Sequence, residues 1–234
     1  MLEQLTIPDV SVIIPTYREE ETIVEVLQRV IKVSEFLGNV EIIVVDDGST
    51  DRTGEKVAAF PFVRYIRHEH NMGKGAAIRT GIKNSCGKVL VIQDADLEYL
   101  PDCIPSLVKP IFAGSMDIVY GSRFKGKPEG MNFFHFVGNF MLNLVARFMY
   151  NAQITDIMTG QKAFRRSVLD SVKLKENGFA VEIEITCLSF NGHRRFIEVP
   201  ISYSYRRHGV SKITYFDGIK SLVKLFSIFL RVYT

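Results

Sequence analysis

The sequence predicts an α/β fold whose central sheet is mainly parallel. Short runs of β-branched and aliphatic residues, at 10–14, 41–45, 63–66 and 89–92, alternate with stretches whose apolar residues follow helical spacing. Most of these runs are apolar throughout, which is typical of strands that helices cover on both faces. Charged residues follow several of the runs. In sheets of this kind, ligands bind beyond the carboxyl ends of the strands.

The bulk composition is that of an ordinary globular protein. The chain has 234 residues, which suits one large domain or two small ones. Its net charge of +3 is mild and does not argue for a nucleic-acid partner. The three cysteines are scattered, without zinc or disulfide spacing, which fits a reducing, cytoplasmic setting. No signal peptide is expected, and no apolar run approaches the ~20 residues of a membrane-spanning helix.

The first two strand–helix units each place carboxylates beyond a strand end. The run at 10–14 is stopped by a proline, and Glu19 lies between that point and a helix. The run at 41–45 ends in Asp46 and Asp47, and a second helix follows. Acidic residues at a helix start are explained by the helix dipole alone. Glu19, which is nearest the strand, could instead face a ligand.

A Gly73-Lys74-Gly75 turn precedes the helix that follows the third strand. The pattern suggests an anion-binding corner made of backbone N–H groups and a lysine. It lacks the spacing of a P-loop and the Ser or Thr that would follow one. The chain also has no Gly-x-Gly-x-x-Gly motif, which disfavours a dinucleotide-dependent dehydrogenase.

The strand at 89–92 ends in Gln93-Asp94-Ala95-Asp96. Side chains two apart on an extended chain point the same way, so the two carboxylates are expected to repel unless a cation lies between them. A hard divalent cation, Mg²⁺ or Mn²⁺, shared with substrate phosphates is the economical candidate. The alternative is a strand that ends in a turn, where Asp is common.

A helix at 101–112 and a strand at 117–120 complete the first half of the chain. The charged residues that follow the strands are expected to meet at one edge of the sheet and to form a binding site. These residues are Glu19, Asp47, Lys74, Asp94, Asp96 and Arg123.

The second half is more apolar. A helix at 133–150 carries its polar residues four apart, as one narrow stripe, so its apolar surface must be buried in the core, an oligomer or a membrane surface. Strands are expected at 161–164 and 195–201. Basic residues at 206–212 suit phosphate binding, although a solvated charge run is the alternative. A final amphipathic helix at 215–234 suits either a membrane surface or a homodimer.

Five segments taken together resemble the inverting family 2 glycosyltransferases of the GT-A fold. They are Pro15-Thr16-Tyr17-Arg18-Glu19, Val45-Asp46-Asp47-Gly48-Ser49, Asn71-Met72-Gly73-Lys74-Gly75, Asp94-Ala95-Asp96 and Gly121-Ser122-Arg123. The later segments Asp156-Ile157-Met158-Thr159-Gly160 and 206–212 resemble the branch that glycosylates dolichyl or polyprenyl phosphate. The resemblance covers nearly the whole chain, in order.

The resemblance implies a single GT-A domain over 1–234. Its nucleotide-sugar half would be 1–123 and its acceptor half 124–214, before the C-terminal helix at 215–234. It implies transfer of a sugar from a UDP- or GDP-sugar to a polyprenyl phosphate by a peripheral enzyme at the cytoplasmic face of a membrane.

The resemblance also assigns residues to roles. The nucleotide pocket would comprise Pro15, Tyr17, Glu19, Val45 and Asp47, with Lys74 nearby. Asp94 and Asp96 would hold Mg²⁺ or Mn²⁺ on the donor diphosphate, Glu98 would be a further ligand, and Ala95 would lie against the donor. The diphosphate and the acceptor phosphate would be surrounded by Arg123, Arg206, Ser211 and Lys212, with Asp156 at the reaction centre.

Some features depart from the family's pattern or leave alternatives open. Arg18 replaces the usual Asn, and His135 stands where relatives commonly have Arg. Asp156 would orient the reactants or, for a hydroxyl acceptor, act as the base. A nucleotidylyltransferase is disfavoured because no Gly-rich loop follows the first strand. A binding scaffold on a transferase fold remains an alternative. A processive synthase of the Gln-x-x-Arg-Trp type is excluded, since the chain has no Trp.

Overall fold

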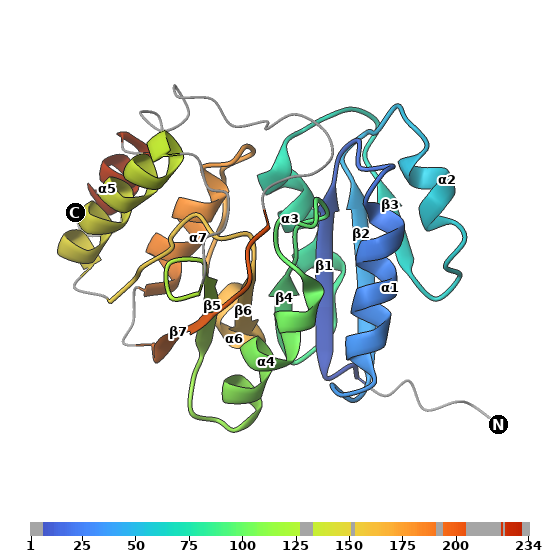
Figure 1. Cartoon of the computed structure of the whole chain (residues 1–234), viewed down its shortest axis with the longest axis horizontal. Helices are drawn as coiled ribbons and strands as arrows, with labels where there is room; N and C mark the ends of the chain where they lie inside the picture. Colours follow the sequence, from blue (N-terminus) through green and yellow to red (C-terminus); the bar gives the residue numbers. More distant parts are fainter. Residues whose placement is uncertain are drawn as a thin grey trace.

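The computed structural model describes residues 7–126, 133–150, 153–190, 194–204, 221 and 223–230. Its described strands form one seven-stranded sheet in the order β3-β2-β1-β4-β6-β5-β7, which crosses Figure 1 from right to left. Neighbouring strands are parallel, except that β6 is antiparallel to β4 and β5. The strands are β1 (Val10–Thr16), β2 (Val40–Asp46), β3 (Arg64–Arg67), β4 (Val89–Ile92), β5 (Ile118–Ser122), β6 (Lys162–Arg165) and β7 (Phe196–Pro200).

Helices lie on both faces of this sheet, as the apolar character of the strands predicts. They are α1 (Ile23–Ser34), α2 (Thr53–Val57), α3 (Lys74–Asn84), α4 (Ile104–Phe112), α5 (Phe133–Tyr150), α6 (Arg166–Asp170) and α7 (Val181–Phe190), with a 3₁₀ turn η1 (Pro101–Cys103). The α/β fold with a mainly parallel sheet is therefore confirmed.

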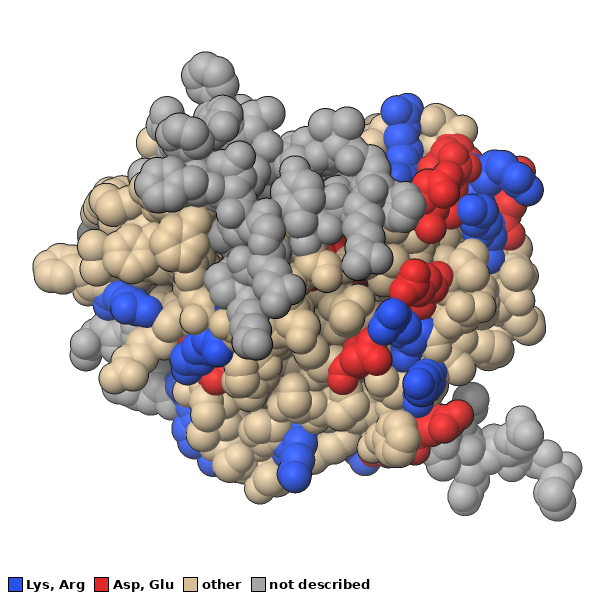
Figure 2. Space-filling model, in the orientation of Figure 1, with Lys and Arg blue, Asp and Glu red and all other residues tan. Residues whose placement is uncertain are grey.

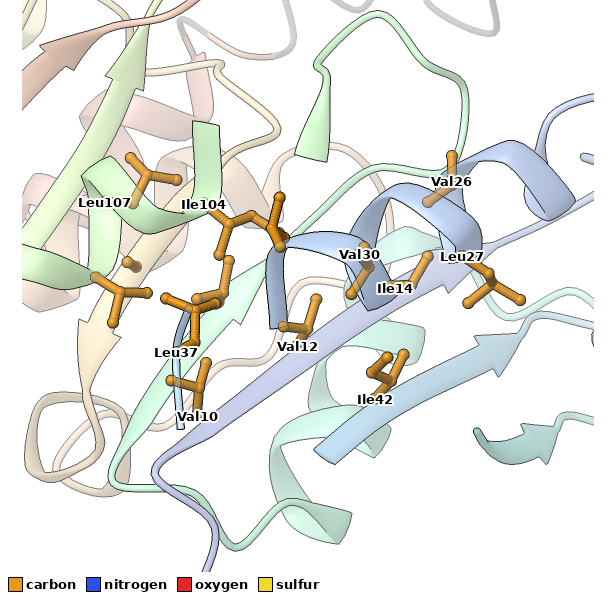
Figure 3. Packing of buried hydrophobic residues seen from close by; sticks show 14 of the residues in the cluster. Val10, Val12, Ile14, Val26, Leu27, Val30, Leu37, Ile42, Ile104 and Leu107 are labelled. Atoms are coloured by element: carbon orange, nitrogen blue, oxygen red, sulfur yellow. The ribbon is translucent and has the colours of Figure 1, made fainter. Parts of the chain in front are cut away.

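The core on one face of the sheet is built from alternate residues of β1. Val10, Val12 and Ile14 belong to one cluster with apolar residues of α1 and α4, and all three are fully buried. Figure 3 shows these side chains among Val30 of α1 and Ile104 of α4. Because side chains alternate along a strand, Ile13 belongs instead to a second cluster, with residues of α3, α5 and α7.

Strand β1 extends further than the sequence predicts. It includes Pro15, although a proline usually ends a strand. Pairing with β4 stops at Ile13, whereas pairing with β2 continues to Thr16. Alternate residues of a strand direct their backbone polar groups to the same side, and those of Ile13 face β4. The nitrogen of Pro15, two residues later, therefore also faces β4. The missing N–H of Pro15 therefore interrupts no bond to β2.

Helix α5 exposes much of its apolar surface and turns part of its polar stripe inward. Phe140, Leu144 and Phe148 are exposed, and Phe148 retains 91% of its accessible surface, whereas Asn143 is buried. The described C-terminal residues, 221 and 223–230, are helical and lie beside α5 at the left of Figure 1. The rest of the C-terminal helix predicted at 215–234 lies outside the described residues.

The described part of the C-terminal helix packs by one side and exposes another. Leu225 and Ile228 are buried in the cluster that contains Leu142 of α5, while Val223 and Phe226 are exposed. Within the described residues, no helix combines the length and the hydrophobicity that are needed to cross a bilayer.

Candidate active site

The predicted site residues of the first half lie at one edge of the sheet. The carboxyl ends of β1, β2 and β4 are side by side there, and the backbone N–H of Asp47 donates to the carbonyl of Thr16 (2.8 Å). Because β6 runs in the opposite direction, its beginning reaches the same edge. There the N–H of Gly121 donates to the carbonyl of Gln161 (3.0 Å). The segments that follow β1, β2, β4 and β5 therefore lie at the same end of the sheet as the segment that precedes β6.

The carboxyl ends of β1 and β2 lie side by side and are buried. Pro15 and Val45 are register partners, and both are buried. Beyond them, Arg18 has a left-handed backbone (φ 53°), and its guanidinium lies 5.2 Å from the centre of the Tyr17 ring. Glu19 is buried and accepts a hydrogen bond from the hydroxyl of Thr22 (3.2 Å). Pro15, Tyr17, Glu19 and Val45 thus lie at the ends of these two strands or just beyond them, and their nucleotide-binding role stays a prediction.

The carboxylate of Asp47 already accepts several hydrogen bonds within the protein. The N–H groups of Met72 and Gly73 donate to it at 2.9 and 2.7 Å, and Nδ1 of His68 lies 2.7 Å from Oδ1. The other ring nitrogen of His68 lies 2.9 Å from the hydroxyl of Thr80. Asp47 therefore ties the end of β2 to the segment that begins α3. The expected contact from Asp47 to a nucleotide base stays a prediction.

The structure contradicts an anion-binding corner of N–H groups at Gly73-Lys74-Gly75. The N–H groups of Gly75 and Ala76 donate to the carbonyl of Asn177, at 2.6 and 3.3 Å. A Cβ on Gly75 would lie 2.1 Å from the carbonyl oxygen of Glu176. These glycines therefore allow two backbones to approach closely, a requirement that local sequence does not distinguish from phosphate binding.

The cation that contacts Asp94 is a lysine. Nζ of Lys74 lies 2.7 Å from Asp94 and 2.7 Å from Glu182 of α7. Glu182 in turn pairs with Lys162 of β6, which is fully buried. Burial disfavours charge on Lys74, but the two carboxylates outweigh it and raise the pKa of Lys74. Burial likewise opposes charge on Glu182, and the two lysines still lower its pKa.

Gly160 makes room for this arrangement. A Cβ at Gly160 would lie 1.9 Å from Oδ2 of Asp94 and 3.1 Å from the ring of Tyr99. Ala95 is buried beside Asp94. The segment before β6 therefore packs directly against the acidic motif, and the carboxylate of Asp94 occupies the space that any larger residue would need.

Two carboxylates, of Asp94 and Asp96, remain the candidates for holding a metal ion. Asp96 accepts the N–H of Glu98 (3.1 Å). In the part of the chain that the structure describes, no three acidic, His or Cys side chains converge as a metal-binding group. Two hard oxygen donors fit a divalent cation that receives further ligands from substrate phosphates. Glu98 as an additional ligand stays a prediction.

Two of the residues predicted to lie near the acceptor, Arg123 and Asp156, form a buried ion pair. Nε and Nη2 of Arg123 each lie 2.7 Å from an oxygen of Asp156, which is fully buried. Burial disfavours the charge of Arg123, yet Asp156 raises its pKa above the ordinary arginine value. The guanidinium also lies over the rings of Tyr99 and Tyr203, at 5.6 and 5.5 Å from their centres. Arg123 is thereby held by a carboxylate and two aromatic rings.

Three predicted residues, Arg206, Ser211 and Lys212, lie outside the described residues. Residues that the sequence analysis did not assign include Glu182, Lys162, Gly160 and the tyrosines that flank Arg123. The sequence does indicate that Glu182 is unusual, because a charged residue inside an apolar run requires a buried partner. Gly160 belongs to the segment 156–160 that carries the family resemblance, but nothing local indicated that it packs against Asp94. Nothing local indicated the pairing of Lys162 with Glu182 either, because the two residues are distant in sequence.

A surface groove elsewhere contains none of these residues. Its volume is about 620 Å³, and it is lined by residues of α1, by Glu21 just before that helix and by Asp102. Arg29 bridges Glu25 and Asp102 there, at 2.8 Å from each. Figure 2 shows acidic and basic side chains interleaved over α1 and α2, so the charges on this face largely neutralise one another.

Comparison with known families gives a match over most of the chain. The sequence profile of the family described as Glycosyl transferase family 2 matches residues 11–173. Dolichol-phosphate mannosyltransferase of Pyrococcus furiosus is 36% identical over 228 residues, which cover 92% of this chain and 63% of that protein. This chain thus spans less than two thirds of that relative. Dolichyl-phosphate hexose transferase of Haloferax volcanii is 32% identical over 229 residues, with 96% of each covered.

Solved structures show the same fold. Glucosyl-3-phosphoglycerate synthase from Mycobacterium tuberculosis, in complex with Mn²⁺, uridine diphosphate and phosphoglyceric acid, superimposes with a TM-score of 0.76. The match covers 95% of this chain and 78% of that chain, at 22% sequence identity. At this identity, the likeness extends to the fold alone.

Proposed function

This chain belongs to glycosyl transferase family 2, and on that premise we propose that it transfers a sugar from a nucleotide sugar to a dolichyl or polyprenyl phosphate. Support for the acceptor comes from the relatives, which are named for dolichol-phosphate and dolichyl-phosphate transfer. The supporting observation in the structure is the proximity of two charged centres. The Asp94–Lys74 pair and the Arg123–Asp156 pair lie at the same end of the sheet: Asp94 and the Tyr99 ring both flank Gly160, and the Arg123 guanidinium lies over that ring.

The proposed reaction is a single displacement. An oxygen of the lipid phosphate attacks the anomeric carbon, the bond from that carbon to the donor diphosphate breaks, and a nucleoside diphosphate leaves. The acceptor phosphate is already an anion near neutral pH, so no strong general base is required. The geometry of Asp156 supports this scheme, because its carboxylate is bound side-on by Arg123 and is better placed to orient that cation than to take a proton.

The residues divide the work between donor and acceptor. A Mg²⁺ or Mn²⁺ ion, if held by Asp94 and Asp96, would supply positive charge for the leaving diphosphate. Lys74 adds a fixed cation beside Asp94. Arg123 would hold the acceptor phosphate, assisted by Arg206, Ser211 and Lys212.

A peripheral location at the cytoplasmic face of a membrane is part of the proposal. The exposed apolar residues of α5 (Phe140, Leu144, Phe148) and of the C-terminal helix (Val223, Phe226) support it. A homodimer formed through the same helices is the alternative. Flotation of the protein with lipid vesicles would support membrane binding, and a dimer mass in analytical ultracentrifugation would support the homodimer.

The experiment has two steps. A thermal-shift panel of UDP- and GDP-sugars, with and without Mn²⁺, should identify one donor that stabilises the protein in a metal-dependent way. Transfer of that labelled sugar to a short-chain polyprenyl phosphate should then be abolished in Asp96→Ala, with an unchanged melting temperature. Full transfer by this variant, or in excess EDTA, would remove the metal from the scheme. Transfer to hydroxyl acceptors alone would replace the proposed acceptor.

A further inference from the structure

Asn143, a buried residue of α5, hydrogen-bonds to the backbone on both sides of Asp156. The side-chain Nδ2 of Asn143 donates to the carbonyl of Thr155, and its Oδ1 accepts the N–H of Ile157 (2.9 Å). These are the residues immediately before and after Asp156. Asn143 is only 4% exposed, and a buried amide is costly unless its donors and acceptors are bonded. One side chain therefore fixes the backbone on both sides of Asp156.

A buried glutamate on a different element, β7, bonds to the same segment. Glu198 of β7 accepts the N–H groups of Thr155 and Asp156 at 2.8 and 3.0 Å, and its second oxygen accepts the hydroxyl of Thr155. Glu198 is 4% exposed. The backbone at Asp156 is thus fixed by two elements that are far apart in sequence, α5 and β7.

This fixed backbone determines the direction of Arg123. Both oxygens of Asp156 accept from the Arg123 guanidinium, and one of them also accepts the backbone N–H of Arg123 (3.0 Å). A planar guanidinium in a side-on pair has little rotational freedom. A shift of the Asp156 backbone would therefore be passed to Arg123, and a misplacement of about 1 Å at such a group can cost about 100-fold in rate.

We infer that Asn143 and Glu198 are positioning residues that aim Arg123 at the acceptor phosphate. The inference rests on the proposed function only for the identity of the acceptor. Neither side chain touches a substrate in this scheme, because both are buried and their polar atoms bond to residues 155–157, through the backbone and, for Glu198, also through the Thr155 hydroxyl. Their action passes through Asp156.

The variants that test this are Asn143→Leu and Glu198→Gln, with Glu41→Gln as the matched control. Glu41 also accepts two consecutive backbone N–H groups and a hydroxyl, those of Cys86, Gly87 and Ser11. It lies near the beginning of β2, at the sheet edge opposite the candidate site. Its loss should cost comparable stability without moving Arg123.

The first measurement does not depend on any activity. The native proteins are treated with phenylglyoxal, which modifies accessible guanidinium groups, and the Arg123 peptide is quantified by mass spectrometry. Modification of Arg123 should rise at least about fivefold in Asn143→Leu and Glu198→Gln and stay at the wild-type level in Glu41→Gln. Equal labelling in all four proteins, or an equal rise in the control, overturns the positioning role.

The second measurement concerns transfer kinetics with the short-chain polyprenyl phosphate. The KM for the lipid phosphate should rise, or kcat fall, by about 10- to 100-fold in both variants, while the KM for the donor changes less than twofold. A rise in labelling with unchanged acceptor kinetics overturns the link between Arg123 and the acceptor. If the wild-type protein transfers no sugar to a lipid phosphate, the proposed function fails, and the labelling result still decides the positioning role.

Discussion

The guanidinium of Arg123 meets the carboxylate of Asp156 side-on, with two N–O distances of 2.7 Å in a site from which water is nearly excluded. A buried pair of this kind stabilises the fold little in itself, because both charges lose their hydration. Removal of one partner is costly, since the other charge is then left uncompensated.

We therefore expect Asp156→Asn to lower the free energy of unfolding by about 3–5 kcal/mol, because it leaves the charge of Arg123 buried without its carboxylate. Urea unfolding followed by circular dichroism measures the change. Transfer activity should be lost as well, at all pH values between 6 and 9. A loss below about 1 kcal/mol would mean that solvent reaches this guanidinium.

The buried pair of Lys162 and Glu182 can be tested with a double-mutant cycle. Glu182→Leu should destabilise the protein by about 3–5 kcal/mol, because it leaves Lys162 buried without a carboxylate. Adding Lys162→Met should recover part of this loss, so that the double variant costs at least about 1 kcal/mol less than the sum of the single ones. Strict additivity of the three unfolding free energies would contradict the pairing.

Substitution of Gly160 should affect activity more than stability. A Cβ there would displace the Asp94 carboxylate from Lys74, which would keep its second carboxylate partner, Glu182. Gly160→Ala should therefore reduce sugar transfer by about 10- to 100-fold with little change in melting temperature. Gly178→Ala is the control, because nothing lies within 4 Å of its Cβ position. Equal activity of the two variants would show that Asp94 need not occupy its present place.

Stability should depend on pH through Asp117, which lies at the start of β5 and binds Arg195 and Arg165. The hydrogen-bonded guanidinium of Arg195 is the main cause that lowers the pKa of Asp117. A carboxyl group with a lowered native pKa stabilises the fold above its unfolded pKa of about 4, and this contribution is lost as the pH falls toward the native value.

Asp117→Asn should accordingly cost about 1–2 kcal/mol at pH 7, a figure kept small because Arg195 is half exposed. The difference from wild type should shrink between pH 4 and pH 2.5. Unfolding free energies measured across that range provide the check. A difference that stays constant would assign the effect to packing.

The alternation of apolar runs with helical spacing was sufficient to predict the strands, most of the helices and the edge at which the charged residues gather. Membership of glycosyl transferase family 2 confirms the resemblance carried by motifs such as Asp94-Ala95-Asp96. The apolar runs are local patterns, and the family motifs follow one another in a fixed order along the chain. Both can be read from a single sequence.

What the sequence could not predict depends on partners across the fold. The repulsion between Asp94 and Asp96 indicated a cation, and the cation found against Asp94 is Lys74. Its second carboxylate, Glu182, comes from α7, and no local pattern places that helix there. The antiparallel direction of β6 likewise depends on the path of the intervening segment. The sequence predicted the polar stripe of α5, but it did not predict that Asn143 in this stripe would hydrogen-bond to the backbone on both sides of Asp156.

The antiparallel strand β6 also has a consequence for biosynthesis. It pairs with β4 along its whole length, from Val89 opposite Arg165 to Ile92 opposite Lys162, so the middle of the sheet is completed by a strand made long after its neighbours. Until β6 emerges from the ribosome, β4 presents an unpaired edge of four buried apolar residues, a template for intermolecular pairing. We expect a fragment that ends at residue 123 to aggregate, and nascent chains of that length to require chaperone protection.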